Sequence, residues 1–527
     1  MTENPQGVPA GGPAGSVLYP TIPDHNELFA APAYQEQFDR KREFEAPCDP
    51  AEAERVAAWS RGWEYRERNF ARQALTVNPE KACQPLGAVL AALGFAGTLP
   101  LVHGSQGCAA YFRSHLTRHF KEPVPAVSSS MTEDAAVFGG LSNLVEALDN
   151  ATALYRPEMV AVSTTCMAEV IGDDLQNFIR TAREKGSVPA GFPVPYAHTP
   201  SFVGSHLNGY DAMLRGILEH LTGSEEAKRD RPAAGTANRV NIVPGFAPYT
   251  GDLRELHRLL GMLGVQHTIL GDHGETLDAP ATGDYDMYPG GTTLAEVREA
   301  PAARATVLLQ EVATRRTAEL VRSGWGQETV TVTTPVGVGN TDRFVQEVTR
   351  LAGVAVPAAV TAERGRLVDA MADSHAYLHG KRVAVAGDPD LVVALLGFLL
   401  ELGMEPVHVL ASNGDEGFRA RAAAVLAGSP FGGRATVWPG KDLWHLRSLV
   451  HTEPVDLLIG SSHLKWLARE AGVPLVRVGF PIFDRHHLHR FPVVGYAGGV
   501  QLLAMLVNTV LDELDRTAPD HSYDLVR

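Results

Sequence analysis

Three of the four cysteines could act together as metal ligands. Cys83, Cys108 and Cys166 follow one another at intervals of 25 and 58 residues, and Cys48 lies upstream of them. Thiolate is the soft ligand that iron-sulfur clusters prefer, and a cubane-type cluster needs about four such ligands. The set is therefore one ligand short, and either a non-sulfur residue or a second chain would have to complete it.

The spacing of these cysteines alone favours ordinary packing, but their surroundings strengthen the case for a cluster. Cys83 lies in KACQPLG, Cys108 follows the turn G-S-Q-G, and Cys166 follows two threonines. Small residues and backbone amides around a sulfur supply room and hydrogen bonds that tune a cluster. The competing interpretation is burial as plain apolar residues, since free cysteine is among the most buried types. Cys48 is expected to be an ordinary free thiol.

The elements that must position these cysteines form a predicted parallel sheet with crossover helices. From Gly97 onward, short apolar runs end in Gly, Ser or Thr, and a stretch with helical spacing follows each run. Most runs are continuous, as strands buried on both faces should be. The candidate strands are residues 99–103, 159–163, 240–244, 267–271, 306–310, 383–387, 407–410, 456–460 and 474–478.

Two of the cysteines directly follow predicted strands. Cys108 comes after the strand at residues 99–103, and Cys166 comes after the strand at 159–163. In open parallel sheets, ligands bind beyond the carboxyl ends of the strands. With no compact C-x-x-C element, the ligands must converge from separate strand ends.

A chain of 527 residues is too long for one ordinary core and predicts an α/β protein with three doubly wound, Rossmann-like domains. Residues 223–238 are polar and resemble a linker, and a second boundary is expected near residue 379. The predicted organisation is an N-terminal extension with a disordered start and a helical remainder, followed by three domains. The ranges are 1–75 for the extension, 76–235 for the domain with the cluster ligands, 236–378 and 379–527.

Several function classes are disfavoured by composition and missing motifs. A formal net charge of -15 without a run of Lys and Arg argues against nucleic acid. The apolar stretch at residues 391–400 falls short of the roughly 20 residues that span a bilayer and predicts a buried helix. The sequence contains neither a complete P-loop nor a complete strand-coupled G-x-G-x-x-G. We therefore do not expect this chain to bind ATP or NAD. The N-terminus shows no secretion signal, so we expect a cytoplasmic protein.

Around the cysteines the chain resembles a known family. The segments ALTVNPEKACQPLGA, HGSQGCAAYFRSH, SMTEDAAVFGG, VSTTCMAEVIGDD, AHTPSFVGSH, GRLVDAMADSH, GKDLWHLRSLV, GFPIFDRHHLH and the terminal YDLVR are similar to those of nitrogenase molybdenum-iron protein beta chains. The resemblance runs from about residue 50 to the end. It implies three doubly wound domains, in agreement with the strand pattern.

The resemblance also implies a ligand set. Cys83, Cys108 and Cys166 would bind an [8Fe-7S] cluster at the interface with an alpha chain that contributes three further cysteines. A serine joins the cluster in its oxidised form, and the matching residue is Ser201 in HTPSFVGSH. From the sequence alone, Ser201 would be interpreted as a helix N-cap.

Three aromatic residues match family positions near the cluster or the interface. They are Tyr111, Phe112 and Phe138. An equally good interpretation is that they are core aromatics, so they are left out of the ligand set.

A second metal site is implied by carboxylates. Asp369 and Asp373 are four residues apart and would share one helix face, although from the spacing alone a solvated acidic face is the better interpretation. The resemblance implies that the pair binds a divalent cation together with Glu122 of a second beta chain, at the beta-beta contact. Lys121 stands where the family often has Arg, a change that a backbone carbonyl ligand would tolerate.

The histidine-rich string DRHHLHR is a weaker candidate for a metal site. His486, His487 and His489 point in different directions on any regular element, so at most two could share an ion. No carboxylate or thiolate partner is evident. Packing or hydrogen bonding at an interface is the better interpretation.

The resemblance implies the beta subunit of an alpha2-beta2 heterotetramer. Its cluster would relay electrons from an ATP-hydrolysing iron protein to an iron-molybdenum cofactor in the alpha chain, for reduction of dinitrogen to ammonia with hydrogen evolution. The missing P-loop fits the assignment of ATP hydrolysis to another protein. The absence of cysteines after Cys166 fits the location of the iron-molybdenum cofactor in the alpha chain. The long N-terminal extension favours the molybdenum type over vanadium or iron-only relatives.

Three other functions remain as alternatives. A beta-like scaffold for cofactor assembly is disfavoured by the Ser201 motif, the extension before Cys83 and the terminal YDLVR. A subunit of light-independent protochlorophyllide reductase is disfavoured by the extension and by DLWHLRSLV. A metal-free interaction protein would have little reason to retain all three cysteines.

Overall fold

The computed structural model describes residues 24–45, 48–73, 75–230 and 233–519. The chain divides into two compact units, residues 1–65 and 66–527. The first unit contains the exposed helices α1 (His25–Ala30), α2 (Pro32–Glu45) and α3 (Pro50–Trp59), and α4 (Trp63–Ala71) begins at its end. The predicted helical part of the extension is confirmed, whereas its predicted disordered start and the terminal YDLVR lie outside the described residues.

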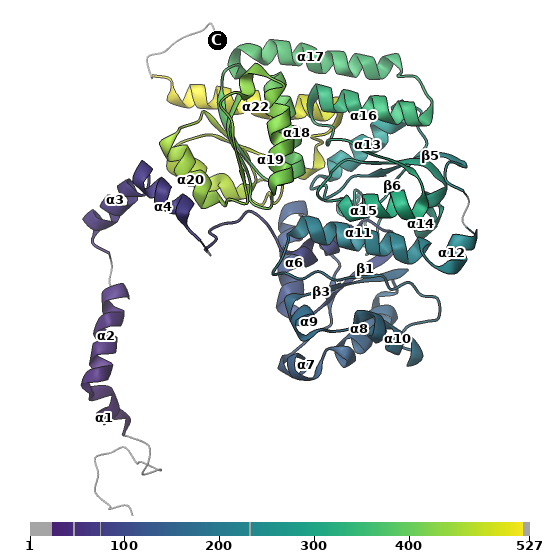
Figure 1. Cartoon of the computed structure of the whole chain (residues 1–527), viewed down its shortest axis with the longest axis horizontal. Coiled ribbons are helices and arrows are strands. Elements are labelled where there is room, and N and C mark those ends of the chain that lie inside the picture. Colours follow the sequence, from purple (N-terminus) through teal and green to yellow (C-terminus); the bar gives the residue numbers. More distant parts are fainter. Residues whose placement is uncertain (1–23, 46–47, 74, 231–232, 520–527) are drawn as a thin grey trace, which may run out of the picture. The chain divides into compact units, whose positions relative to one another are not determined.

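Three parallel sheets flanked by helices form the second unit, as Figure 1 shows. The first sheet has the order β2-β1-β3-β4, with β1 (Thr98–His103), β2 (Val127–Ser128), β3 (Met159–Thr164) and β4 (Tyr196–Ala197). The second has the order β6-β5-β7-β8, with β5 (Ala237–Val243), β6 (His267–Ile269), β7 (Ala303–Leu308) and β8 (Glu328–Thr331). The third has the order β11-β10-β9-β12-β13, with β9 (Arg382–Ala386), β10 (Glu405–Ala411), β11 (Thr436–Pro439), β12 (Leu457–Gly460) and β13 (Leu475–Arg477). The predicted α/β fold class is confirmed.

Every predicted strand occurs, but four short strands were not predicted. These are β2, β4, β8 and β11, and each lies at an edge of its sheet. An edge strand has one neighbour and is less buried, so it lacks the continuous apolar run on which the prediction relied. The predicted linker at residues 223–238 contains the short helix α12 and the start of β5. The four predicted ranges, with three boundaries between them, remain predictions.

Helices connect the strands and cover both faces of the sheets. Those before β5 are α5 (Gln84–Leu93), α6 (Gln106–Phe120), α7 (Glu133–Phe138), α8 (Leu141–Tyr155), α9 (Cys166–Ile171), α10 (Leu175–Glu184), α11 (His206–Thr222) and α12 (Glu225–Asp230). Those between β5 and β9 are α13 (Thr250–Met262), α14 (Leu294–Glu299), α15 (Arg315–Glu319), α16 (Gly337–Ala352) and α17 (Ala358–Leu378), with the 3-10 helix η1 (Ala300–Ala302) and the π-helix η2 (Leu320–Trp325). Those after β9 are α18 (Pro389–Glu401), α19 (Glu416–Ala427), α20 (Leu443–Thr452), α21 (Lys465–Ala471) and α22 (Gly495–Thr517), with η3 (Pro430–Gly432), η4 (Ser462–Leu464) and η5 (Leu488–Arg490).

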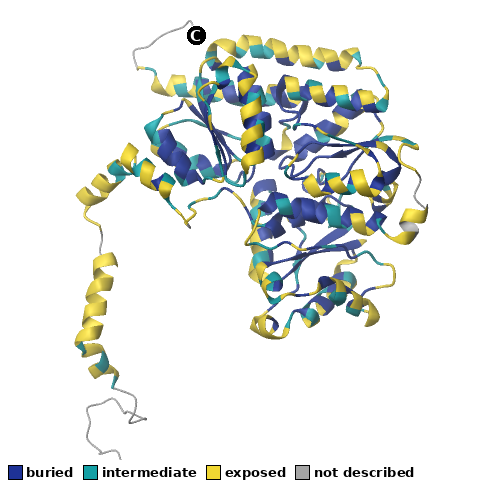
Figure 2. Cartoon of the chain, in the orientation of Figure 1, coloured by how far each residue is buried: buried dark blue, intermediate teal, exposed yellow. Residues whose placement is uncertain are grey.

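The apolar helices belong to the core. Residues 391–400 lie in α18 and are almost entirely buried, as predicted (Figure 2). Within the described residues, α22 is the one helix long and apolar enough to cross a membrane by length and composition. Its residues Leu502, Leu503 and Leu506 are buried, and it packs against α16 and α17. We therefore interpret α22 as a core helix.

The segment that leads to Cys83 is tied to the third sheet's helices. Arg72 Nη2 lies 2.8 Å from Asp442 Oδ2, and the backbone N–H of Val77 donates to the same oxygen at 2.8 Å. Asp442 is also the N-cap of α20 and accepts from the backbone N–H of His445. One buried carboxylate thus fixes both a helix end and the path of the chain toward the first cysteine.

Candidate metal centre

The three predicted cysteines each lie at the start of a helix. Cys83 is the N-cap residue of α5, Cys108 is in the first turn of α6, and Cys166 is the first residue of α9. The side chains of Cys83 and Cys108 are half-buried, while Cys166 and Cys48 are exposed. The positive end of a helix dipole favours an anion, so it would stabilise the thiolate form that a metal-bound cysteine takes.

The fold brings the three thiols together. Burial raises the pKa of Cys83, and the charge of Cys166 raises it further. Burial also raises the pKa of Cys108, to which the charges of Cys166 and Cys83 both add. Each sulfur therefore lies within electrostatic range of the other two, although 83 residues separate the first from the last.

The arrangement fits a group larger than one metal ion. Among residues 24–45, 48–73, 75–230 and 233–519, no three His, Cys, Asp or Glu side chains converge closely enough to hold a single ion. A multi-iron cluster presents several metal atoms to separate thiolates, so three thiols within electrostatic range of one another are a donor set that suits it.

Ser201 belongs to the same site. Burial raises the pKa of the Cys83 thiol, and the nearby Ser201 side chain partly counteracts this effect. The interpretation of Ser201 as a helix N-cap is wrong, because Ser205 caps α11 in a capping box with Asn208. The Ser201 hydroxyl is thus available to the cysteine site.

Helix packing fixes the loop that contains Ser201. Gln84 Nε2 donates to the backbone oxygens of Pro200 at 3.1 Å and Val203 at 2.9 Å. The backbone N–H of His206 donates to the oxygen of Ala82 at 2.9 Å. Residues on both sides of Cys83 therefore bind both sides of the Ser201 loop.

A buried network that the sequence did not reveal joins the strand ends below the cysteines. His103, the last residue of β1, has Nδ1 2.9 Å from Ser129 Oγ and Nε2 2.9 Å from Asp173 Oδ2. Ser129, His103 and Asp173 are therefore connected like the members of a Ser-His-Asp catalytic triad. His103 is fully buried, however, so no substrate could reach it. Asp173 follows α9, so the network links the strand before Cys108 to the helix that begins with Cys166.

Comparison with known proteins places this geometry in a family. A family model described as nitrogenase component 1 type oxidoreductase matches residues 83–511. The chain belongs to this family. It is 64% identical over 504 residues to the nitrogenase molybdenum-iron protein beta chain of Frankia alni, covering 96% of each chain. A protein of the same description from Nostoc sp. is 54% identical over 510 residues, covering 96% of this chain and 98% of the relative.

Solved structures agree with the family assignment. A structure described as nitrogenase Cp1 at pH 6.5 matches with a TM-score of 0.82 and 39% identity, over 86% of this chain and 98% of that one. A second, described as nitrogenase Cp1 at pH 5, matches with a TM-score of 0.63 at 17% identity, which shows the fold alone. Residues 18–69 also match a model described only as a domain of unknown function. This family member is therefore an oxidoreductase of the nitrogenase type.

The three aromatic residues predicted to lie near the cluster or the interface divide into two groups. Phe112 is buried in the core, whereas Tyr111 is 49% exposed and Phe138 is 86% exposed. Tyr111 also lies within electrostatic range of Cys83, which adds to the effect of burial in raising the tyrosine pKa. Val170 of α9 and Phe202, the neighbour of Ser201, are exposed apolar side chains as well. The elements that hold the thiols thus present an apolar surface.

The predicted cation ligands do not meet within one chain. Asp369 and Asp373 are exposed on α17, one turn apart. Glu122 instead accepts from Arg490 Nη2 at 3.3 Å. Because the prediction assigned Glu122 to a second chain, this separation does not test it, and the site remains a prediction.

The histidine string does not gather around one point. His486 and His487 are exposed with their rings 5.7 Å apart, whereas His489 is buried beside His119. Burial lowers the pKa of His489 to about 4. His489 is therefore a neutral core residue, in keeping with the packing interpretation.

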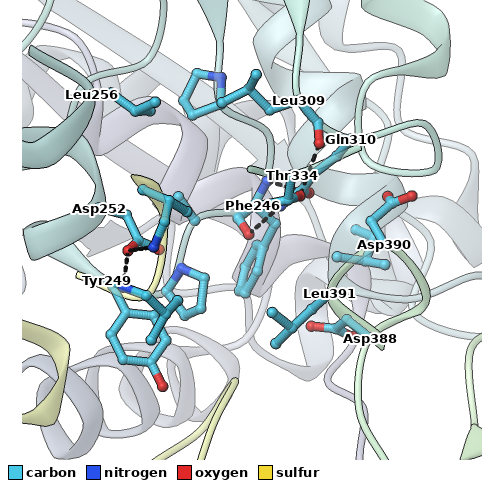
Figure 3. Close-up of a pocket in the computed structure, with 16 residues that line it drawn as sticks. Phe246, Tyr249, Asp252, Leu256, Leu309, Gln310, Thr334, Asp388, Asp390 and Leu391 are labelled. Carbon is cyan, nitrogen blue, oxygen red and sulfur yellow. Dashed lines mark hydrogen bonds between the residues drawn. The ribbon is translucent and has the colours of Figure 1, made fainter. Parts of the chain in front are cut away.

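A small hollow lies between the second and third sheets, and Figure 3 shows it. Its volume is about 30 Å³, which is room for roughly two water molecules and too little for a cluster. Most of its walls are apolar, but Asp252, Asp388 and Asp390 also line it. We therefore place no cluster in this hollow.

Asp252 in this hollow gives the protein a testable pH dependence. Burial raises its pKa from 3.8 to about 7, although the backbone N–H groups of Val493 and Val494 donate to it. The folded state thus binds a proton that the unfolded state releases above about pH 4, so this contribution to stability is lost as the pH rises toward 7. Asp252→Asn keeps the acceptor oxygen and removes the titration. We expect the variant to gain up to about 4 kcal/mol over the wild type between pH 4 and 8.

Thermal unfolding of both proteins across this pH range measures the effect. Asp512→Asn, at an exposed position of α22, is the control and should show no such trend. A constant difference between Asp252→Asn and the wild type would contradict the prediction.

Proposed function

We propose that the chain is the beta-type subunit of a molybdenum-iron nitrogenase component and holds its side of an electron-relay cluster. The observation that carries this proposal is the meeting of Cys83, Cys108, Cys166 and Ser201 at one site from four separate segments. The beta-chain descriptions of the relatives from Frankia alni and Nostoc sp. support it.

The four side chains would bind half of an [8Fe-7S] cluster, and cysteines of an alpha chain would complete it. When bound, the cluster would supply one-electron transfer between an iron protein and an iron-molybdenum cofactor in the alpha chain, for reduction of dinitrogen with hydrogen evolution. Because burial raises the pKa values of Cys83 and Cys108, these thiols are protonated at neutral pH before loading. Binding iron must therefore release their protons.

An exposed apolar surface supports the proposed partners. The apolar side chains of Tyr111, Phe138, Val170 and Phe202 would be covered by an alpha chain or by the docking iron protein in the cytoplasm. Two such pairs would form an alpha2-beta2 tetramer. At its beta-beta contact, Asp369 and Asp373 of one chain would bind a divalent cation with Glu122 of the other.

Anaerobic co-purification of the chain with its alpha partner tests this function. Iron counting should find eight cluster irons per pair beyond those of the alpha-chain cofactor. Electron paramagnetic resonance should show the signals of an oxidisable cluster. A stable pair that lacks these irons, or that reduces no dinitrogen with the iron protein, would instead indicate an assembly scaffold.

Replacing Ser201 should affect the oxidised state alone. In Ser201→Ala, the three thiolates remain, so we expect the reduced complex to keep its full iron content. The oxidised complex should lose the contribution of the hydroxyl and show a changed resonance signal and a shifted potential. Ser205→Ala is the matched control, because it removes the α11 cap and is expected to lower stability by about 1 kcal/mol without changing the signal. An unchanged signal and potential in oxidised Ser201→Ala would exclude Ser201 as a ligand.

A further inference from the structure

Two histidines outside the cysteine site face each other at the edge of the second sheet. His257 lies on α13 and His267 begins β6, both of which are labelled in Figure 1. His257 Nδ1 is 2.8 Å from His267 Nε2, and the ring centroids are 5.0 Å apart. The His257 side chain is 46% exposed, so solvent reaches the pair.

The outer nitrogens of both rings are donors. His267 Nδ1 lies 2.9 Å from the backbone oxygen of Val265, and a carbonyl oxygen can only accept. His257 Nε2 lies 2.7 Å from Asp272 Oδ2. Burial acts to raise the pKa of Asp272, but the hydrogen bonds from His257 and from the Gly274 N–H hold it below its usual value. Asp272 is thus an ionised acceptor, and His257 Nε2 carries the proton.

It follows that the two inner nitrogens both carry lone pairs when the rings are neutral. Two lone pairs at 2.8 Å repel each other unless a cation lies between them. A proton or a metal ion could fill this role. Metal-ligating histidines almost always donate their other N–H to a carboxylate or a backbone carbonyl. Here His257 donates to the Asp272 carboxylate, and His267 donates to the Val265 carbonyl.

We propose that His257 Nδ1 and His267 Nε2 bind a divalent transition-metal ion such as Zn²⁺, with Asp272 orienting His257. Two Zn–N bonds of about 2.0 to 2.1 Å at a tetrahedral angle place the nitrogens about 3.3 Å apart. The exposed His257 ring can open the pair by this amount. The ion would connect α13 to the edge strand β6, and water would complete its coordination.

The surroundings limit the affinity of this site. With only two protein ligands, binding is expected in the micromolar range rather than in that of a closed structural zinc site. Burial lowers the pKa of His267, and the charge of Arg239 lowers it further. Arg239 also pairs with Glu299 at 3.5 Å. The inference is independent of the proposed electron-relay function, because no cysteine takes part.

The test uses the cluster-loaded complex with the alpha partner. The complex is treated with a chelator and dialysed against micromolar ZnCl₂, and zinc is counted by mass spectrometry. We expect the wild type to bind one more zinc per chain than His257→Gln or His267→Gln. Zinc-edge X-ray absorption of the wild type should show nitrogen neighbours with imidazole scattering.

Two further variants sharpen the result. Asp272→Asn keeps an acceptor for the Gly274 N–H but loses the charge that orients His257, so zinc affinity should fall about tenfold. His486→Gln removes an exposed histidine elsewhere and should bind zinc like the wild type. Thermal melting confirms that each variant is folded.

Equal zinc uptake by the wild type, His257→Gln and His267→Gln would overturn the proposal and leave a shared proton as the cation between the rings. A zinc shell with sulfur neighbours would overturn it as well, since it would place the ion at a cysteine.

Discussion

Cys108→Ala is expected to abolish dinitrogen reduction by the reconstituted complex and to remove the iron of one [8Fe-7S] cluster per alpha-beta pair. Cys108 lies in the first turn of α6 with its side chain half-buried, next to the charges of Cys83 and Cys166. In the proposed cluster, alanine would leave one iron without its thiolate, and the two other thiolates and the hydroxyl of this chain could not replace that ligand. Iron counting and electron paramagnetic resonance measure the loss.

The fold itself should survive this substitution. Alanine is a good helix former and removes one sulfur from a partly exposed position, at a cost of about 1 kcal/mol. Cys48→Ala is the matched control, because Cys48 is an exposed free thiol in the N-terminal unit. It should keep full iron content and activity. A Cys108→Ala complex with intact iron and redox signals would show that the assignment of the cluster is wrong.

The sequence predicted the interior of the sheets better than their edges. Strands such as β3 and β9 are buried on both faces and appear as continuous apolar runs, so their positions could be predicted. At the edges this signal fades. In β8 the sequence ETVT is half exposed, and β2 has only two residues. An edge strand forms because it pairs with a strand that is distant in the sequence. The local sequence pattern carries no information about that pairing.

The candidate site could be predicted only in part for the same reason. Three scattered cysteines gave the ligand type, but their convergence depends on how α5, α6 and α9 begin. To decide whether Ser201 or Ser205 is the helix N-cap, one must know where α11 begins. The structure places the N-cap at Ser205, about one helical turn after Ser201. The contacts of His103 with Ser129 and Asp173 join residues up to 70 positions apart, and no local signal reveals them.

Gly209→Ala is expected to be among the most destabilising single changes outside the ligands. Helices α5 and α11 cross with their backbones almost in contact, and each contributes a glycine at the crossing. A Cβ on Gly209 would lie 1.8 Å from the backbone oxygen of Gln84, and one on Gly87 would lie 1.7 Å from that of His206. Because both obstacles are backbone atoms, no side-chain rotation relieves the overlap. The helices must separate, and we expect a loss of at least about 3 kcal/mol in unfolding free energy.

The same separation should reach the cysteine site. Cys83 caps α5, and Gln84 holds the Ser201 loop through its side chain, so moving α5 away from α11 displaces a ligand and its neighbour together. Iron content should therefore fall along with the melting temperature. Gly365→Ala on α17 is the matched control, since a Cβ there meets no atom within 4 Å. Alanine at this exposed helical position should stabilise the chain by up to about 1 kcal/mol. If Gly209→Ala melts like the wild type and keeps its iron, the close crossing of α5 and α11 does not position the site.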